Sequence, residues 1–98
     1  MKWITKSKRH KLYKRDGFKC VYCNSGASEN NPLSLDHIVC RSKGGKHNKE
    51  NLIVACHHCN SCRSDMSIAD FQRYLFNNYG IRTKGLARKI KRLTRKNI

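Results

Sequence analysis

Two cysteine pairs carry the clearest chemical signal in this sequence of 98 residues. Cys20 and Cys23 are separated by two residues, Cys56 and Cys59 repeat that spacing, and 32 residues lie between the pairs. Four thiolates supplied by two such turns fit the tetrahedral coordination of Zn²⁺. The spacing therefore predicts a structural zinc site, with redox-active pairs or buried free thiols as the alternatives.

A zinc ion would also compensate for a small core. Hydrophobic residues make up 38% of the chain, and that share includes six cysteines. Binding free energy at a four-cysteine site is folding free energy, on the order of 10 kcal/mol, and it stabilises chains that bury little apolar surface. Cys40 and Cys62 lie outside the two pairs. We interpret them as partly buried free thiols, with a second metal site that includes His57 or His58 as the alternative.

The net charge of +16 indicates a polyanionic partner. Residues 1–19 carry eight Lys and Arg against one acidic residue, residues 20–60 carry four against three, and residues 61–98 carry ten against two. This distribution favours ordered nucleic-acid contact over solvated, partly disordered charge. We expect a basic N-terminal helix or arm over residues 1–19, a metal-bearing core over residues 20–65 and a basic helical extension over residues 66–98.

Local patterns predict a small α+β fold around the cysteines. A basic helix is expected over residues 7–15, and alternating apolar residues predict strands over residues 33–39 and 52–55. A turn at residues 42–45 separates the strands, and the next helix is expected to begin at Cys56. The core therefore has the order strand, loop, strand, helix.

The last third of the chain predicts two helices. Ser67 and Asp70 form a capping pattern, and apolar residues spaced by three or four continue to Gly80. A basic helix follows from Thr83, with one narrow aliphatic stripe. A membrane-surface helix is one interpretation, but contact with phosphates is preferred because the stripe lacks Trp and Phe. Without a membrane-spanning run or a secretory signal near the start, we expect a cytoplasmic protein.

The residues around the cysteine pairs resemble the HNH endonuclease family. The matching stretches follow the family's order: Lys14 to Cys20, Leu35 to Val39, Ser42 to Gly45, Glu50 to Leu52, and Cys56 to Arg63. The resemblance covers about residues 8–65. It implies a ββα-metal fold, in which a hairpin and the following helix hold one catalytic divalent ion and a four-cysteine zinc site stabilises the hairpin.

The resemblance also implies roles for individual residues. His37 corresponds to the general base that activates water, and Asp36 and Asn60 correspond to ligands of a catalytic Mg²⁺ or Mn²⁺ ion, with Ni²⁺ as a further candidate. Asn51 corresponds to the asparagine that orients the histidine loop, with an ordinary turn residue as the alternative. Arg63 follows Asn60 by three residues on the same helical face and is expected to hold the scissile phosphate.

These residue types suit phosphodiester hydrolysis, because one histidine and one hard cation can supply a nucleophile and charge stabilisation. The reference pKa of His37, about 6.5, is expected to be lowered by nearby positive charge and raised by Asp36. Adjacent strand residues point to opposite faces, so the strand is expected to end, twist or bulge at Asp36 and His37.

The resemblance thus predicts a metal-dependent HNH endonuclease that nicks or cuts double-stranded DNA and leaves 5′-phosphate and 3′-hydroxyl ends. Phosphate contacts are expected from ten basic residues: Lys8, Arg9, Lys11, Arg41, Lys43, Lys46, Arg63, Arg88, Lys89 and Arg92. The alternative is a non-catalytic zinc-knuckle protein that binds DNA or RNA. Likeness to small stand-alone members further suggests a phage protein in the bacterial host cytoplasm, acting as a homodimer or with a packaging partner.

Overall fold

An antiparallel hairpin of two strands lies at the centre of the computed structural model, which describes residues 4–83 and residue 86. Strand β1 (Leu33–His37) pairs with strand β2 (Leu52–Cys56) in a regular register. Helix α2 (His57–Arg63) follows β2 directly and packs against both strands. The predicted α+β class and the order strand, strand, helix are confirmed.

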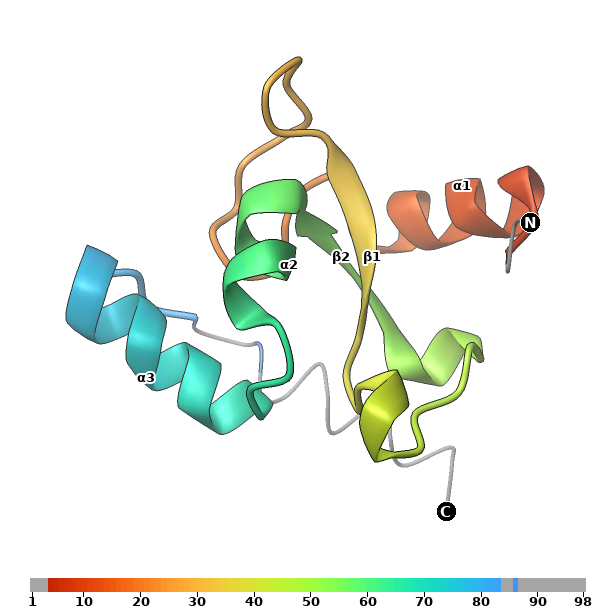
Figure 1. Cartoon of the computed structure of the whole chain (residues 1–98). Coiled ribbons are helices and arrows are strands. Elements are labelled where there is room, and N and C mark those ends of the chain that lie inside the picture. The colour runs from red at the N-terminus through yellow and green to blue at the C-terminus, as the bar shows by residue number, and fades with distance from the viewer. Residues whose placement is uncertain (1–3, 84–85, 87–98) are drawn as a thin grey trace.

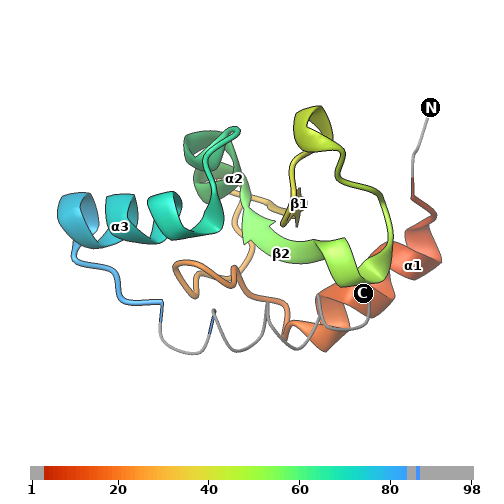
Figure 2. The same ribbon diagram turned by 90° about the horizontal axis from the view of Figure 1, so that it is seen from below.

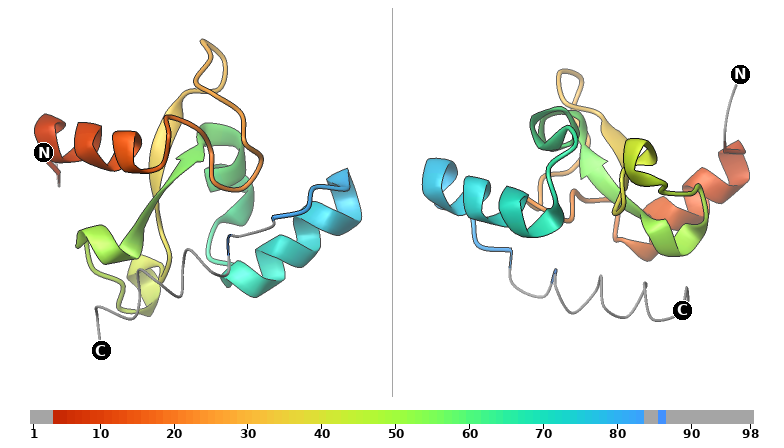
Figure 3. Two further views of the ribbon diagram at one scale, coloured as in Figure 1. Left: turned by 180° about the vertical axis from the view of Figure 1, so that it is seen from behind. Right: turned by 60° about the horizontal axis from the view of Figure 1, so that its bottom comes forward.

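Helix α1 (Lys6–Arg15) lies on one side of the hairpin, and the views in Figures 1, 2 and 3 agree on this placement. Charged groups at its end bind it to β2. The guanidinium of Arg15 donates to the Leu52 carbonyl at 2.6 Å, and the Asp16 carboxylate accepts the N–H of Val54 at 2.9 Å. The end of α1 is therefore hydrogen-bonded to the backbone of β2.

Helix α3 (Ile68–Tyr79) lies on the opposite side of the hairpin, as Figure 1 shows. It begins after Ser67, whose hydroxyl accepts the N–H of Asp70 at 3.1 Å. It ends at Gly80, which adopts a left-handed conformation with φ of 65°. Both ends of this helix lie where the sequence predicts them.

Both faces of the hairpin are buried, because its alternating side chains enter two separate clusters. Leu52 and Val54 belong to the cluster that contains Leu12 of α1. Ile53 belongs to the other cluster, which contains the paired cysteines and Phe71 of α3. Every residue of β2 is consequently buried.

The loop between the strands contains two short 3₁₀ turns, η1 (Arg41–Lys43) and η2 (Lys49–Asn51). Gly44 ends the first turn with φ of 89°. A Cβ on Gly45 would lie 1.6 Å from the Val39 carbonyl oxygen, so the loop closes on itself only with glycine at this position.

The helix expected from Thr83 lies almost entirely outside the described residues, and so do Arg88, Lys89 and Arg92. Among the helices that are described, none is long and apolar enough to cross a membrane. The division of the chain at residues 19/20 and 65/66 stays a prediction.

Candidate metal centre and active site

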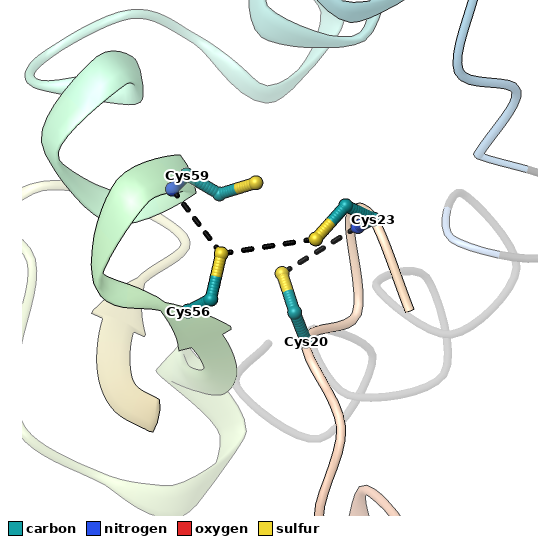
Figure 4. A group of neighbouring side chains, drawn as sticks. All are labelled: Cys20, Cys23, Cys56 and Cys59. Atoms are coloured by element: carbon teal, nitrogen blue, oxygen red, sulfur yellow. Dashed lines mark hydrogen bonds between the residues drawn. The ribbon is translucent and has the colours of Figure 1, made fainter. Parts of the chain in front are cut away.

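The four paired cysteines meet beside the hairpin (Figure 4). Cys20 and Cys23 come from the turn that precedes β1, Cys56 ends β2, and Cys59 lies in α2. Their sulfur atoms all lie within 4.8 Å of one another, and those of Cys23 and Cys56 are 3.7 Å apart. Zn–S bonds of about 2.3 Å in a tetrahedron place sulfurs about 3.8 Å apart. The cluster therefore fits a structural Zn²⁺ ion.

Backbone hydrogen bonds to two of the four sulfurs, those of Cys20 and Cys56, favour the thiolate form that binds zinc. The N–H of Cys23 donates to the sulfur of Cys20 at 3.5 Å, and the N–H of Cys59 donates to the sulfur of Cys56 at 3.4 Å. Hydrogen bonding with Cys59 lowers the pKa of the Cys20 thiol to about 5, and the same contact raises the pKa of Cys59.

The two remaining cysteines lie apart from this centre. The Cys40 sulfur is 3.3 Å from the Ser42 hydroxyl, and the Cys62 sulfur is 3.7 Å from Nε2 of His58. Within the described part of the chain, the paired cysteines form the single group of three or more His, Cys, Asp or Glu side chains arranged for a metal. The alternative of a second such site is not supported.

A buried ion pair joins the end of β1 to α2. Arg63 is 1% exposed, and its Nη1 lies 2.8 Å from Oδ2 of Asp36. The Tyr22 hydroxyl donates to the same oxygen at 2.5 Å. The guanidinium also donates to the backbone carbonyls of His37 and Ile38, at 2.5 and 2.6 Å. One side chain thus holds three consecutive residues at the end of the strand.

The burial of Arg63 does not support the predicted contact with the scissile phosphate. Its position three residues after Asn60 does place it on α2, but the side chain enters the core and not the solvent. Its Nε donates to the Met66 carbonyl at 3.0 Å, so the guanidinium is held by groups of the fold itself. The ion pair with Arg63 therefore fixes the position of the Asp36 carboxylate.

Asp36 and Asn60 both belong to the side of the hairpin that α2 covers. Nδ2 of Asn60 donates to the Ser34 hydroxyl at 2.9 Å and to the Leu35 carbonyl at 3.2 Å. Ser34 and Asp36 share one face of β1, because side chains alternate along a strand. Tyr22 and Arg63 both donate to Oδ2 of Asp36, and Asn60 donates through its Nδ2. Oδ1 of Asp36 and Oδ1 of Asn60 take no part in these bonds and are therefore the candidate ligand atoms. Two hard oxygens suit Mg²⁺ or Mn²⁺.

His37 is the last residue of β1, and its side chain leaves on the other face. The register is regular through the pair His37 and Leu52, so the strand ends here without a bulge. Nε2 of His37 lies 2.9 Å from Nδ1 of His47, which belongs to the loop between the strands. The structure thus places the predicted base and the predicted ligand Asp36 on opposite faces of the same strand end.

Asn51 explains why β1 stops two residues earlier than the sequence predicts. Its backbone carbonyl accepts the N–H of Ile38, and its side-chain Oδ1 accepts the N–H of Val39, each at 2.8 Å. Its Nδ2 donates to the carbonyls of Val39 and Lys46 at 3.1 and 2.8 Å. Asn51 therefore joins both ends of the loop that follows His37, which supports a positioning role over that of an ordinary turn residue.

The surroundings of His37 lower its pKa below the usual 6.5. Burial is the largest cause, and the positive charges of His47 and Arg41 act in the same direction. Asp36 acts in the opposite direction, more weakly than burial and the His47 charge. The neutral imidazole that a general base requires is therefore favoured at neutral pH.

Residues 20–66 match the family model described as HNH endonuclease. This segment belongs to the HNH endonuclease family. The chain is also 34% identical over 62 residues to the CRISPR-associated endonuclease Cas9 of Corynebacterium diphtheriae, a match over 62% of this chain and 6% of that protein. The chain is thus similar over 62 residues to a small part of a far longer protein.

A solved structure shares the fold of the HNH segment and its flanks. The crystal structure of the Type II-C Cas9 enzyme from Actinomyces naeslundii superimposes with a TM-score of 0.60 and 21% identity, over 97% of this chain and 11% of that chain. At this identity the likeness shows the fold alone. The chain spans about a tenth or less of the length of both relatives.

The basic residues predicted to contact phosphates are distributed around the HNH segment. Five are exposed on α1 or on the loop between the strands: Lys8, Lys11, Arg41, Lys43 and Lys46. Arg9 instead donates to the Tyr13 hydroxyl at 3.3 Å, and Lys43 also donates to the Asp65 carbonyl at 3.1 Å. His47 had no predicted role, because only the folded loop brings it into contact with His37.

Removal of one zinc ligand should abolish the fold of the HNH segment. In Cys59→Ser, a hydroxyl replaces one of four thiolates, so we expect loss of bound zinc and of cooperative thermal unfolding. Cys62→Ser is the matched control, because Cys62 lies in the same helix outside the cluster. Zinc content and thermal circular dichroism measure both variants. A cooperative, folded Cys59→Ser protein without zinc would contradict the structural role.

Removal of the buried arginine should destabilise the protein strongly. Arg63→Ala leaves the Asp36 carboxylate buried without its cation, which costs about 3–5 kcal/mol of unfolding free energy. The control is Arg73→Ala, whose ion pair with Asp70 is exposed by 70% and 62% and should contribute less than about 1 kcal/mol. Urea unfolding of the zinc-loaded variants compares them, and equal losses would refute the positioning role.

Loss of the neighbouring histidine should raise the pKa of His37. His47→Ala removes a positive charge and admits water, and both changes favour the imidazolium form. Without added divalent ions, NMR titration of the His37 ring should show a midpoint closer to 6.5 than in wild type. His57→Ala, which changes an exposed histidine, should leave the midpoint in place. A His37 midpoint that His47→Ala leaves unmoved would be the contrary result.

Proposed function

We propose that the protein is a metal-dependent endonuclease that hydrolyses phosphodiester bonds in double-stranded DNA. The observation that carries the proposal is the HNH family match over residues 20–66, in which the candidate base and ligands occupy one strand end and the adjoining helix. The Cas9 relative from Corynebacterium diphtheriae is named an endonuclease, and its similarity supports the same chemistry in this chain.

In this proposal His37 accepts a proton from water, and the resulting hydroxide attacks phosphorus. The bond from phosphorus to the 3′ oxygen breaks, the 3′ oxygen takes a proton from solvent, and the products carry 5′-phosphate and 3′-hydroxyl ends. Asp36 and Asn60 would hold a divalent ion through their Oδ1 atoms. When bound, Mg²⁺ or Mn²⁺ neutralises charge on the phosphate and on the leaving oxygen.

The opposite orientations of His37 and Asp36 are compatible with this chemistry, because β1 ends at His37. A phosphate placed at the end of the strand can face side chains from both sides of the hairpin. Arg63 fixes Oδ2 of Asp36, and Asn51 fixes the loop that begins after His37. Neither residue needs to contact the substrate.

The resemblance to small members of the family adds three points to the proposal. The protein acts as a homodimer or with a phage packaging partner, it is located in the bacterial host cytoplasm, and its catalytic ion is Mg²⁺, Mn²⁺ or Ni²⁺. A non-catalytic zinc-knuckle protein is the second candidate function, because Nε2 of His37 faces His47 and the side chain lies on the face of β1 opposite Asp36.

Cleavage of supercoiled plasmid tests the proposal. Wild-type protein should nick or linearise the plasmid at low salt when Mg²⁺ or Mn²⁺ is added, and His37→Ala should cut at least about 10²-fold more slowly. His57→Ala is the matched control, since it removes an exposed histidine of the same segment and should retain activity.

A gel shift of the same DNA accompanies the assay. His37→Ala should bind as wild type does, because the imidazole is proposed to act on water. Full cleavage by His37→Ala would refute the assignment of the base. Binding by wild type without cleavage in any metal would refute the enzyme and support the zinc-knuckle alternative.

A further inference from the structure

A groove of about 740 Å³ lies between α1 and the loop that leads into β2. Its floor includes the apolar side chains of Leu12 and Leu52, and its walls are basic. The cationic or titratable residues that line it are Lys8, Lys11, Arg15, His47 and Lys49. A concave surface with this lining suits a polyanion more than a neutral ligand.

The α1 wall of the groove is one face of a helix. Lys8, Lys11 and Arg15 follow one another at spacings of three and four, so their side chains project in the same direction. At about 1.5 Å per residue, the wall from Lys8 to Arg15 is about 10 Å long. One strand of DNA carries a phosphate about every 3.4 Å along the helix axis, so a wall of this length can contact more than one phosphate of a strand.

Three lysines supply charge that the fold does not use. Lys8, Lys11 and Lys49 are exposed, and none of the ion pairs found in the described ranges includes them. Arg15 differs, because its guanidinium already binds the Asp16 carboxylate and the Lys49 carbonyl. The lysines are therefore the groups able to release counterions when a polyanion binds.

The groove leads to the candidate base. His47 lines it, and Nδ1 of His47 lies 2.9 Å from Nε2 of His37. Leu52 lies on the groove floor and pairs with His37 in the hairpin register. A strand bound along α1 would therefore reach the end of β1, where His37 is found.

We infer that this groove binds the backbone of the DNA strand that is cut and guides it to His37. The inference rests on the proposed function, and it adds which basic residues bind the substrate. It adds Lys49, which the sequence did not single out, and it separates Lys8, Lys11 and Arg15 from the basic residues of α1 outside the groove.

Salt dependence of DNA binding distinguishes the groove from general positive charge. The groove variant combines Lys8→Gln, Lys11→Gln and Lys49→Gln. The control variant combines Lys6→Gln, Lys14→Gln and Lys19→Gln, which change exposed lysines outside the groove and remove the same charge. Each set of three substitutions is introduced into the His37→Ala protein, and its DNA affinity is compared with that of His37→Ala alone. Fluorescence anisotropy with a labelled duplex of about 20 base pairs, without added divalent ions, measures affinity at several salt concentrations.

Each phosphate contact contributes about 0.9 to the slope of log affinity against log salt. The groove variant should lose about 2.7 from this slope, and the control should lose less than about 1. In the cleavage assay with His37 restored, the groove variant should raise KM and leave kcat within about twofold, because uniform binding is lost. Both variants should show wild-type thermal unfolding.

Equal losses of slope in the two variants, or no binding by the His37→Ala parent, would overturn the groove assignment. A different result affects the proposed function instead. If the groove variant alone loses slope but wild type cuts no DNA in any metal, the groove is a DNA-binding surface and the nuclease proposal fails. The binding and cleavage measurements therefore report on the two proposals separately.

Discussion

The buried guanidinium of Arg63 is the interaction on which the candidate site depends. A charge that is 1% exposed is tolerated only when it is paired and its donors are used. Asp36 supplies the opposite charge, and backbone carbonyls at the end of β1 and after α2 accept the other hydrogen bonds. The ion pair thus fixes the backbone and the carboxylate at the same point. It leaves Oδ1 of Asp36 outside both side-chain bonds, which is the atom a divalent ion would need.

Helix α2 shows how a small chain holds such a site without a large core. A helix of seven residues is unstable by itself, because few hydrogen bonds offset the cost of nucleation. Cys59, one of the four clustered cysteines, lies in its first turn, and Arg63 is its last residue. Asn60 lies between these two points and bonds to β1. The metal centre and the ion pair therefore hold opposite ends of the helix that presents a candidate ligand.

The sequence predicted the parts of the fold that depend on local spacing. The two cysteine pairs, the Ser67 cap and the Gly80 end all depend on residues close together in the chain. Arg63 could not be predicted in the same way, because a spacing of three gives a common helix face and not the surface that this face meets. His47 contacts His37 through the folded loop between the strands, and β1 ends early because Asn51 bonds to that loop. These contacts are set by tertiary structure.

Side chains alternate along β1, so Asp36 and His37 lie on different faces of the hairpin. The face toward α2 carries Asp36, whose environment is closed and supplies one balancing cation. The face toward α1 carries His37 beside a basic groove, where positive charge and burial favour the neutral base. The proposed base His37 and the proposed ligand Asp36 are adjacent in the chain, but they lie on different faces of the hairpin and have different neighbours. In the proposed mechanism the regular strand end would separate the two roles and would not be an obstacle to catalysis.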